Sequence, residues 1–272
     1  MKRHTFLTIT LCAVASVATA QTAARSFTVY ESDNTDHGFN IENVDSIVFS
    51  PNRAAAASEA PRQINGRWCS LGTSISWLND NTEDYVGRGL TKGYQTRVME
   101  KFAFKKFYNK AVNGGTLSSA IAAVSLADYY TIEHGINDWG HSTPVGTIED
   151  YIRDTKNGTF AATYRQVIDK IFQRNKKARV ILCTPRKAYG FGGYLPDHWY
   201  DPLNGIYLEE YANIIRQIAA YESFPVADFF AEAGGQRQLD YWSYDTALHP
   251  NDEGMQIMAN ILIQAFEKIL QE

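Results

Sequence analysis

The chain has 272 residues, of which 44 % are apolar and 21 % are charged, and its formal net charge is −4 at pH 7. This composition excludes an intrinsically disordered chain, a disulfide-stapled miniprotein and a repeat array, because the apolar fraction suffices for a core. The isoelectric point near 5.9 and the lack of a basic stripe argue against a nucleic-acid or anionic-membrane partner. The length suits one main domain with additional segments.

Residues 1–20 have the pattern of a secretory signal peptide. Lys2-Arg3-His4 form a positive start, residues 6–17 are apolar, and Ala18-Thr19-Ala20 offers small residues for cleavage before Gln21. The apolar run is shorter than the roughly 20 residues that a membrane-spanning helix needs, so no integral membrane span is expected. We therefore expect Sec-type export, with the mature protein in the periplasm, at the cell surface or outside the cell.

Residues 21–63 are predicted to form a short β-rich extension and a linker. Residues 26–50 alternate apolar and polar side chains around a turn-rich centre, which predicts a strand, a turn and a second strand ending in Ser46–Phe49. Residues 51–63 are rich in alanine and contain two prolines, as is typical of a linker. The main domain is then expected over residues 64–272.

Short apolar strands alternate with helical stretches through the main domain. Strands are predicted near residues 67–71, 104–108, 129–133, 179–183 and 225–228, and helices near 117–127, 161–174, 208–221 and 253–270. This alternation predicts an α/β fold with three layers, in which a parallel sheet lies between helices. In such folds the functional side chains lie at the carboxyl ends of the strands.

The expected mature chain contains two cysteines, Cys69 and Cys183, and each ends an apolar run that reads as a buried strand. Buried free thiols and a disulfide both fit this pattern. No Cys-x-x-Cys pair occurs, so the sequence gives no support for thiol redox chemistry or a structural zinc site.

Four polar signatures occupy the ends of predicted strands or the start of the last helix. They are Ser74 in Gly72–Ser76, the glycine pair in Asn113–Thr116, the Asn-Asp pair in Gly135–Trp139, and the histidine in Asp245–Asn251. Each has an ordinary structural explanation when taken alone: a helix cap, a tight turn, an Asx-turn and a turn before proline.

Together, and in this order, the four signatures resemble those of the SGNH (GDSL-type) hydrolase family. The most specific pieces are Gly-Ile-Asn-Asp at 135–138 and Leu-His-Pro-Asn-Asp-Glu-Gly at 248–254, and the resemblance covers residues 65–272. It implies a flavodoxin-like domain with a five-stranded parallel sheet and a serine esterase activity that requires no metal and no cofactor.

The resemblance assigns a role to each signature. Ser74 matches the nucleophile and His249 the general base, while the N–H groups of Ser74 and Gly114 and the side chain of Asn137 match the oxyanion hole. A serine hydroxyl needs a neighbouring imidazole to take its proton, and the oxyanion that forms needs fixed donors. A carboxylate that orients the imidazole completes such a site.

The sequence departs from the family pattern at two positions. Thr73 stands where the family usually has Asp, which predicts a changed turn rather than lost activity. The carboxylate normally precedes the histidine by three residues, but residue 246 is Thr. Asp245 is therefore the expected acid, with Asp240 or a backbone carbonyl as alternatives.

Other polar and aromatic groups lie close to the expected site. Glu133, His134, Asp138 and His141 are near one another in sequence, but neighbouring strand residues point to opposite faces, so no metal site is predicted. The long glycine-rich segment 186–205 is interpreted as a substrate-binding loop.

Four aromatic residues also fall near the catalytic end, and Trp139, Trp199 and Trp242 are the substrate-binding candidates, with Tyr200 beside them. Their rings either stack on a sugar, line an acyl pocket or anchor loops in the core.

The sequence thus predicts a secreted carboxylic ester hydrolase, with a short acyl ester on a carbohydrate as the preferred substrate. A lipase or lysophospholipase of the same family is one alternative. A carbohydrate-binding or surface protein whose catalytic groups have decayed is another. The expected ligand is a small-molecule or glycan ester, and the sequence identifies no partner protein.

Overall fold

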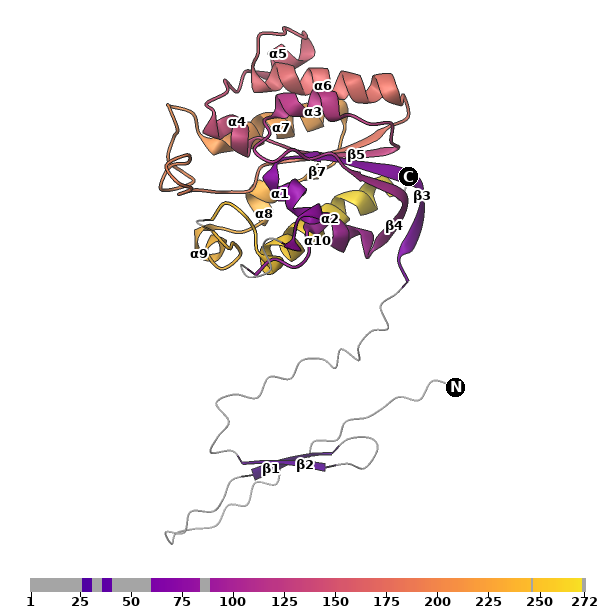
Figure 1. The fold of residues 1–272 in the computed structure, drawn as a ribbon, viewed down its shortest axis with the longest axis vertical. Helices are drawn as coiled ribbons and strands as arrows, with labels where there is room; N and C mark the ends of the chain where they lie inside the picture. Colours follow the sequence, from indigo (N-terminus) through magenta and orange to yellow (C-terminus); the bar gives the residue numbers. More distant parts are fainter. Residues whose placement is uncertain (1–25, 31–35, 41–59, 84–88, 246, 271–272) are drawn as a thin grey trace. The chain divides into compact units, whose positions relative to one another are not determined.

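The computed structural model describes residues 26–30, 36–40, 60–83, 89–245 and 247–270, and the chain divides into two units between Glu59 and Ala60 (Figure 1). In the first unit, β1 (Ser26–Tyr30) and β2 (Asp36–Asn40) form a two-stranded antiparallel sheet. The sequence places the second strand later, at Ser46–Phe49, and that segment lies outside the described residues.

The second unit is built on five parallel strands in the order β4-β3-β5-β6-β7. The strands are β3 (Arg62–Gly72), β4 (Phe102–Asn109), β5 (Tyr129–Glu133), β6 (Arg179–Cys183) and β7 (Val226–Ala227). The helices are α1 (Ser74–Trp77), η2 (Leu78–Asp80), α2 (Tyr94–Met99), α3 (Leu117–Ala123), α4 (Ile136–Gly140), α5 (Ile148–Ile152), α6 (Phe160–Arg174), α7 (Leu208–Glu222), α8 (Phe229–Glu232), α9 (Gln236–Leu239) and α10 (Asp252–Leu270). The predicted three-layer α/β fold with a five-stranded parallel sheet is therefore confirmed.

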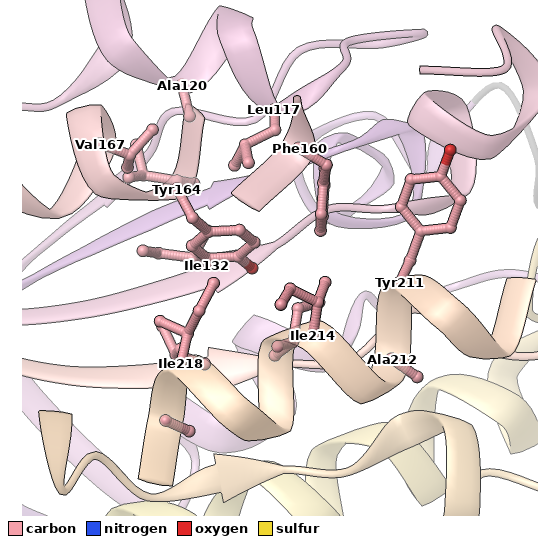
Figure 2. Packing of buried hydrophobic residues seen from close by; sticks show 14 of the residues in the cluster. Leu117, Ala120, Ile132, Phe160, Tyr164, Val167, Tyr211, Ala212, Ile214 and Ile218 are labelled. Atoms are coloured by element: carbon pink, nitrogen blue, oxygen red, sulfur yellow. The ribbon is translucent and has the colours of Figure 1, made fainter. Parts of the chain in front are cut away.

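One face of the sheet is covered by α3, α6 and α7 (Figure 1). Tyr130 and Ile132 of β5 point to this face because alternate strand residues share a side. Helix α6 turns Phe160, Tyr164 and Val167 toward them, and α7 adds an apolar stripe from below in Figure 2. The helical spacing of these apolar residues explains why the sequence predicts both helices.

The other face is covered by α1, α2 and α10 (Figure 1). Trp68 of β3 is fully buried there, and its ring meets Phe266 of α10 edge-on at a centroid distance of 5.1 Å. The indole N–H of Trp68 donates to the Thr131 hydroxyl at 3.0 Å, which satisfies a polar group inside the core.

The two cysteines are free and buried, and they pack on opposite faces of the sheet. Cys69 of β3 lies in the core under α3 and α6, whereas Cys183 of β6 lies in the core beside α10. A disulfide between them is therefore excluded in this fold, and burial raises the pKa of the Cys69 thiol to about 11.

Helix α3 ends at Ala123, whereas the sequence pattern predicts it to run to residue 127. The Tyr130 hydroxyl donates to the Ser125 carbonyl at 2.6 Å and accepts the Ala127 N–H at 2.9 Å, and these bonds fix the chain in a turn before β5.

Among the described residues, no helix combines the length and apolar character that a membrane crossing requires.

Candidate active site

The turn from β3 into α1 presents the hydroxyl of Ser74. Thr73 is the N-cap of α1, and its side chain accepts the Ile75 N–H at 3.4 Å. Because Thr73 caps the helix, the Ser74 hydroxyl is not used as a cap, and the Ser74 N–H lies at a helix start that lacks intrahelical acceptors. Threonine thus retains the capping role that an aspartate at this position could fill.

Ser74, His249 and Asp245 form a chain of hydrogen bonds. The Ser74 Oγ lies 2.9 Å from His249 Nε2, and His249 Nδ1 lies 2.6 Å from Asp245 Oδ2. Asp245 Oδ1 also accepts the backbone N–H of His249 at 2.7 Å. Burial alone raises the pKa of Asp245, but its hydrogen bonds with His249 hold that pKa below its ordinary value. Asp240, the alternative acid, instead accepts a hydrogen bond from the Tyr189 hydroxyl.

Gly114 and Asn137 approach Ser74 from the ends of the two neighbouring strands, and all three line one pocket. Gly114 has φ +70°, a left-handed conformation that a side chain would disfavour. The Asn137 amide donates one N–H to the Gly115 carbonyl at 3.0 Å, which leaves its second N–H for another acceptor. Asp138 accepts the Leu117 N–H and so ties the two loops together.

The pocket beside Ser74 has a volume of about 350 Å³. Its lining combines polar groups with four aromatic rings. The lining residues are Ser74, Trp77, Leu78, Asn113, Gly114, Asn137, His141, Phe191, Tyr194, Tyr244, Leu248 and His249. Phe191 and Tyr194 belong to the segment 186–205, so this part of the loop does reach the pocket. Tyr194 lies over the backbone of Gly140, where a Cβ atom would come within 2.1 Å of the ring.

Trp139, Trp199 and Trp242 are not among the lining residues. Trp139 is therefore corrected as a substrate-binding candidate, because its ring is buried in the core, whereas for half-buried Trp199 and Trp242 that role stays a prediction. Trp139 is fully buried, and its indole N–H donates to the Ile206 carbonyl at 2.9 Å. Trp199 packs edge-on against Phe230, and the Trp242 ring lies against the backbone of Gly234. Buried Trp139 thus anchors the chain around Ile206, because a large aromatic side chain gains most when it is buried.

The sequence matches the GDSL-like lipase/acylhydrolase family model over residues 70–257. The chain belongs to this family. No curated protein matches the sequence. Among solved structures, a possible lipase from Chitinophaga pinensis DSM 2588 is 27 % identical with a TM-score of 0.67, and the match covers 76 % of this chain and all of that chain. A protein from Lactobacillus plantarum shares the fold at 20 % identity and a TM-score of 0.58, over 76 % of this chain and 98 % of that one.

This GDSL-family chain carries a buried carboxyl group directly beneath the Ser74 turn. Glu133 Oε2 accepts hydrogen bonds from the Thr73 N–H at 3.2 Å, the Thr73 hydroxyl at 2.9 Å and the Ser76 hydroxyl at 2.9 Å. The Ser76 hydroxyl also lies 2.6 Å from that of Tyr94. Burial raises the pKa of Glu133 to about 7 despite these hydrogen bonds.

The other polar residues near Glu133 have separate surroundings. His134 is fully buried, and burial lowers its pKa to about 3, so its ring is neutral. Asp138 is held by the Leu117 N–H, and burial raises its pKa to about 6. His141 lies in the pocket, where its ring meets Tyr194 edge-on. Within the described ranges, no three of the residues that bind metals gather as ligands would.

Sequence reasoning missed Trp77 and Tyr244 as pocket residues. Trp77 lies three residues after Ser74 on a helix, so both side chains share one face, and this spacing was available in the sequence. The Tyr244 ring stacks on the His249 imidazole at a centroid distance of 5.6 Å, and only its position one residue before Asp245 hinted at this contact.

Proposed function

We propose that this GDSL-family acylhydrolase cleaves a short acyl ester, such as acetyl, on a carbohydrate, through an acyl-enzyme on Ser74. His249 takes the hydroxyl proton as the oxygen attacks the ester carbonyl, and Asp245 orients the imidazole and stabilises its positive form. The imidazolium then returns the proton to the leaving alcohol, and water releases the acid by the same steps in reverse order. The observation that carries this proposal is the unbroken hydrogen-bond chain from Ser74 to Asp245 at the pocket.

The oxyanion of the tetrahedral intermediate would lie between the N–H groups of Ser74 and Gly114 and the free N–H of the Asn137 amide. These groups line the same pocket as the Ser74 hydroxyl. Their positions are fixed before substrate arrives, because the Asn137 amide is already held by the Gly115 carbonyl. Donors fixed in this way stabilise developing charge without a cost of reorganisation.

The pocket supports the choice of a short acyl group and a sugar. Its volume of about 350 Å³ is near the lower end of the roughly 300–1,000 Å³ that is typical of ligand pockets. Aromatic rings from Phe191 and Tyr244 lie beside polar groups of Asn113 and His141. Sugar rings combine apolar C–H faces with hydroxyl edges, and this mixture of side chains suits both.

The test compares 4-nitrophenyl acetate, butyrate and octanoate, and then acetylated xylo-oligosaccharides against a lysophospholipid. The proposal expects kcat/KM to be highest for the acetyl ester and to fall with chain length, and acetate to be released from the oligosaccharide. A higher kcat/KM for octanoate together with lysophospholipid cleavage would make the chain a lipase instead. No turnover and no labelling by a fluorophosphonate would identify a decayed binding protein.

Phe191 offers a matched test of the alcohol side of the pocket. Phe191→Ala should raise KM for the acetylated oligosaccharide by several-fold, because a stacking face is lost. Its edge-on contact with His249 is lost as well, so any fall in kcat should be the same for 4-nitrophenyl acetate, while KM for that small ester should change less. Tyr221→Ala, which removes an exposed ring from α7, is the control and should change neither value. Equal effects of both variants would argue against a sugar site at Phe191.

We further propose that the enzyme is exported and acts outside the cytoplasm. The charged start, the apolar run and Ala18-Thr19-Ala20 support this. Mass spectrometry of the protein from a periplasmic or culture fraction should find Gln21 as the first residue. An intact Met1 in the cytoplasmic fraction alone would refute export.

A further inference from the structure

Arg186 follows β6 by three residues and is the only arginine among the described residues that is nearly fully buried, with 2 % of its surface exposed. Burial lowers the pKa of its guanidinium to about 10, so the group remains charged at neutral pH. A buried charge is costly unless hydrogen bonds and an opposite charge compensate for it. The groups that the Arg186 guanidinium contacts therefore indicate which part of the structure it stabilises.

All recorded hydrogen bonds of the guanidinium go to one segment, residues 239–248. Nη2 donates to the Ser243 hydroxyl at 2.9 Å and to the Leu239 carbonyl at 3.4 Å. Nη1 donates to the carbonyls of Ala247 and Leu248 at 3.4 and 3.5 Å. The last two carbonyls belong to the residues directly before His249.

Leu239 ends α9 and Ser243 forms an isolated bridge with Pro250, but the other described residues of the segment belong to no helix or strand. Between Asp245 and His249 the backbone turns through Ala247, which has a left-handed φ of +55°. An alanine in that conformation is strained and persists only when its surroundings hold it. The negative charge of Asp245, the carboxylate that contacts His249, also raises the pKa of the Arg186 guanidinium against the larger effect of burial.

We propose that Arg186 is a positioning residue, whose buried planar guanidinium gathers the carbonyls of the 239–248 segment and thereby sets the placement of Asp245 against His249. The inference rests on the proposed function, because it concerns how the groups of that site are held. Arg186 does not touch the pocket and acts only through the segment. A guanidinium suits the task because it presents five N–H donors in a rigid planar fork, whereas an ammonium group is a compact charge with three donors on a flexible stem.

The test uses Arg186→Lys, which keeps the charge, and Arg186→Gln, which keeps donors without charge. Active sites are titrated with a fluorophosphonate, and kcat for 4-nitrophenyl acetate is expressed per titrated site. We expect kcat per site to fall by on the order of 10²-fold in Arg186→Gln and less in Arg186→Lys, because small misplacements of catalytic groups carry losses of this size. KM should change little, because the pocket residues remain.

The split between kcat and KM separates positioning from plain stabilisation. A variant that only loses stability has fewer titrated sites, but each remaining site turns over at the wild-type rate. A misplaced Asp245–His249 pair instead lowers kcat per titrated site while KM stays close to that of wild type. Lys187→Met is the control, because Lys187 donates to the Phe230 carbonyl and not to residues 239–248.

The outcomes are distinct. If Arg186→Lys and Arg186→Gln melt at lower temperature but retain the wild-type kcat per titrated site, Arg186 only stabilises the fold and the proposal is overturned. If wild-type protein is not labelled, or if Ser74→Ala keeps full activity, the proposed function fails instead. A loss of kcat per site with an unchanged Lys187→Met control supports positioning by Arg186.

Discussion

The candidate site has two halves that are positioned in different ways. The sheet half consists of Ser74, Gly114 and Asn137, which follow the carboxyl ends of β3, β4 and β5. The loop half consists of Asp245 and His249, which lie on an irregular segment before α10. The sheet half is positioned by the strands themselves, and hydrogen bonds between adjacent loops complete it. The loop half does not follow a strand of the sheet. An isolated antiparallel bridge between Ser243 and Pro250 closes its turn, and the Tyr244 N–H donates to the His249 carbonyl at 3.1 Å. The Asp245 carboxylate, which contacts the ring and the backbone of His249, and buried Arg186 hold it further.

The difference matters because the chemistry needs both halves within hydrogen-bond distance. A parallel sheet brings the ends of its strands to one edge, so the sheet half follows from the fold. The loop half does not follow from the sheet, and it includes Ala247 in a left-handed conformation that its surroundings must hold. We therefore expect substitutions in the sheet half to remove chemical groups, and substitutions around the loop half to change their placement.

The largest effect is expected for Ser74→Ala in the sheet half. Removal of the attacking oxygen should lower kcat by on the order of 10⁶-fold and leave only the small residual catalysis that the oxyanion donors and substrate binding supply. The assay is hydrolysis of 4-nitrophenyl acetate at pH 8, with thermal melting to show that the variant is folded. Full activity in the folded variant would exclude Ser74 as the nucleophile.

Asp245→Asn should give the next largest effect and tests the loop half directly. The amide keeps the shape of the side chain but removes the charge that stabilises the imidazolium, so kcat should fall by about 10³–10⁴-fold. Asp240→Asn is the matched control, because its carboxylate contacts Tyr189 rather than His249. Activity of Asp245→Asn within a few-fold of wild type would mean that another group orients His249.

Asn137→Ala returns to the sheet half and should be weaker still. Loss of one oxyanion donor is expected to lower kcat by about 10²–10³-fold with little change in KM, since the donor acts mainly on the transition state. Because the Asn137 amide also holds the Gly115 carbonyl, its loss could displace the loop of Gly114. A KM that rises as much as kcat falls would point to such displacement rather than to a lost donor.

The sequence predicted the sheet half more completely than its surroundings. Strand ends can be read from apolar runs, and the four signatures mark residues that the fold brings together. Arg186 carried no comparable signal, because its partners are mainly backbone carbonyls 53 to 62 residues away, and every residue offers a carbonyl. Trp139 was misassigned for a related reason: an aromatic residue after a strand suits a pocket and a core equally well until its neighbours are known.

The smallest expected effect concerns the buried carboxyl group that supports the sheet half. The pKa of Glu133 is raised from 4.5 to about 7 by burial, so the folded protein binds this proton more tightly than the unfolded chain. Its contribution to stability is fully present below pH 4.5 and is lost as the pH rises through about 7. Glu133→Gln is neutral at every pH. The free energy of unfolding of the variant, minus that of the wild type, should therefore rise by about 3 kcal/mol between pH 4 and pH 8.

Denaturant unfolding at the two pH values measures this difference, and the exposed Glu149→Gln serves as the control. The stability that depends on buried His134 changes with pH in the opposite direction, because its pKa is lowered to about 3 and the fold loses stability as the pH falls below 6.5. This contribution is the same in wild type and variant, so it cancels in the difference between their free energies of unfolding. A difference that does not change with pH would show that Glu133 keeps an ordinary pKa in the fold. A change of the expected sign, with kcat at pH 8 close to that of wild type, would show that the Ser74 turn is held by the sheet and its cap. Glu133 and Arg186 would then differ in kind: the buried carboxyl group beneath the sheet half changes the free energy of unfolding, whereas the buried guanidinium behind the loop half changes kcat.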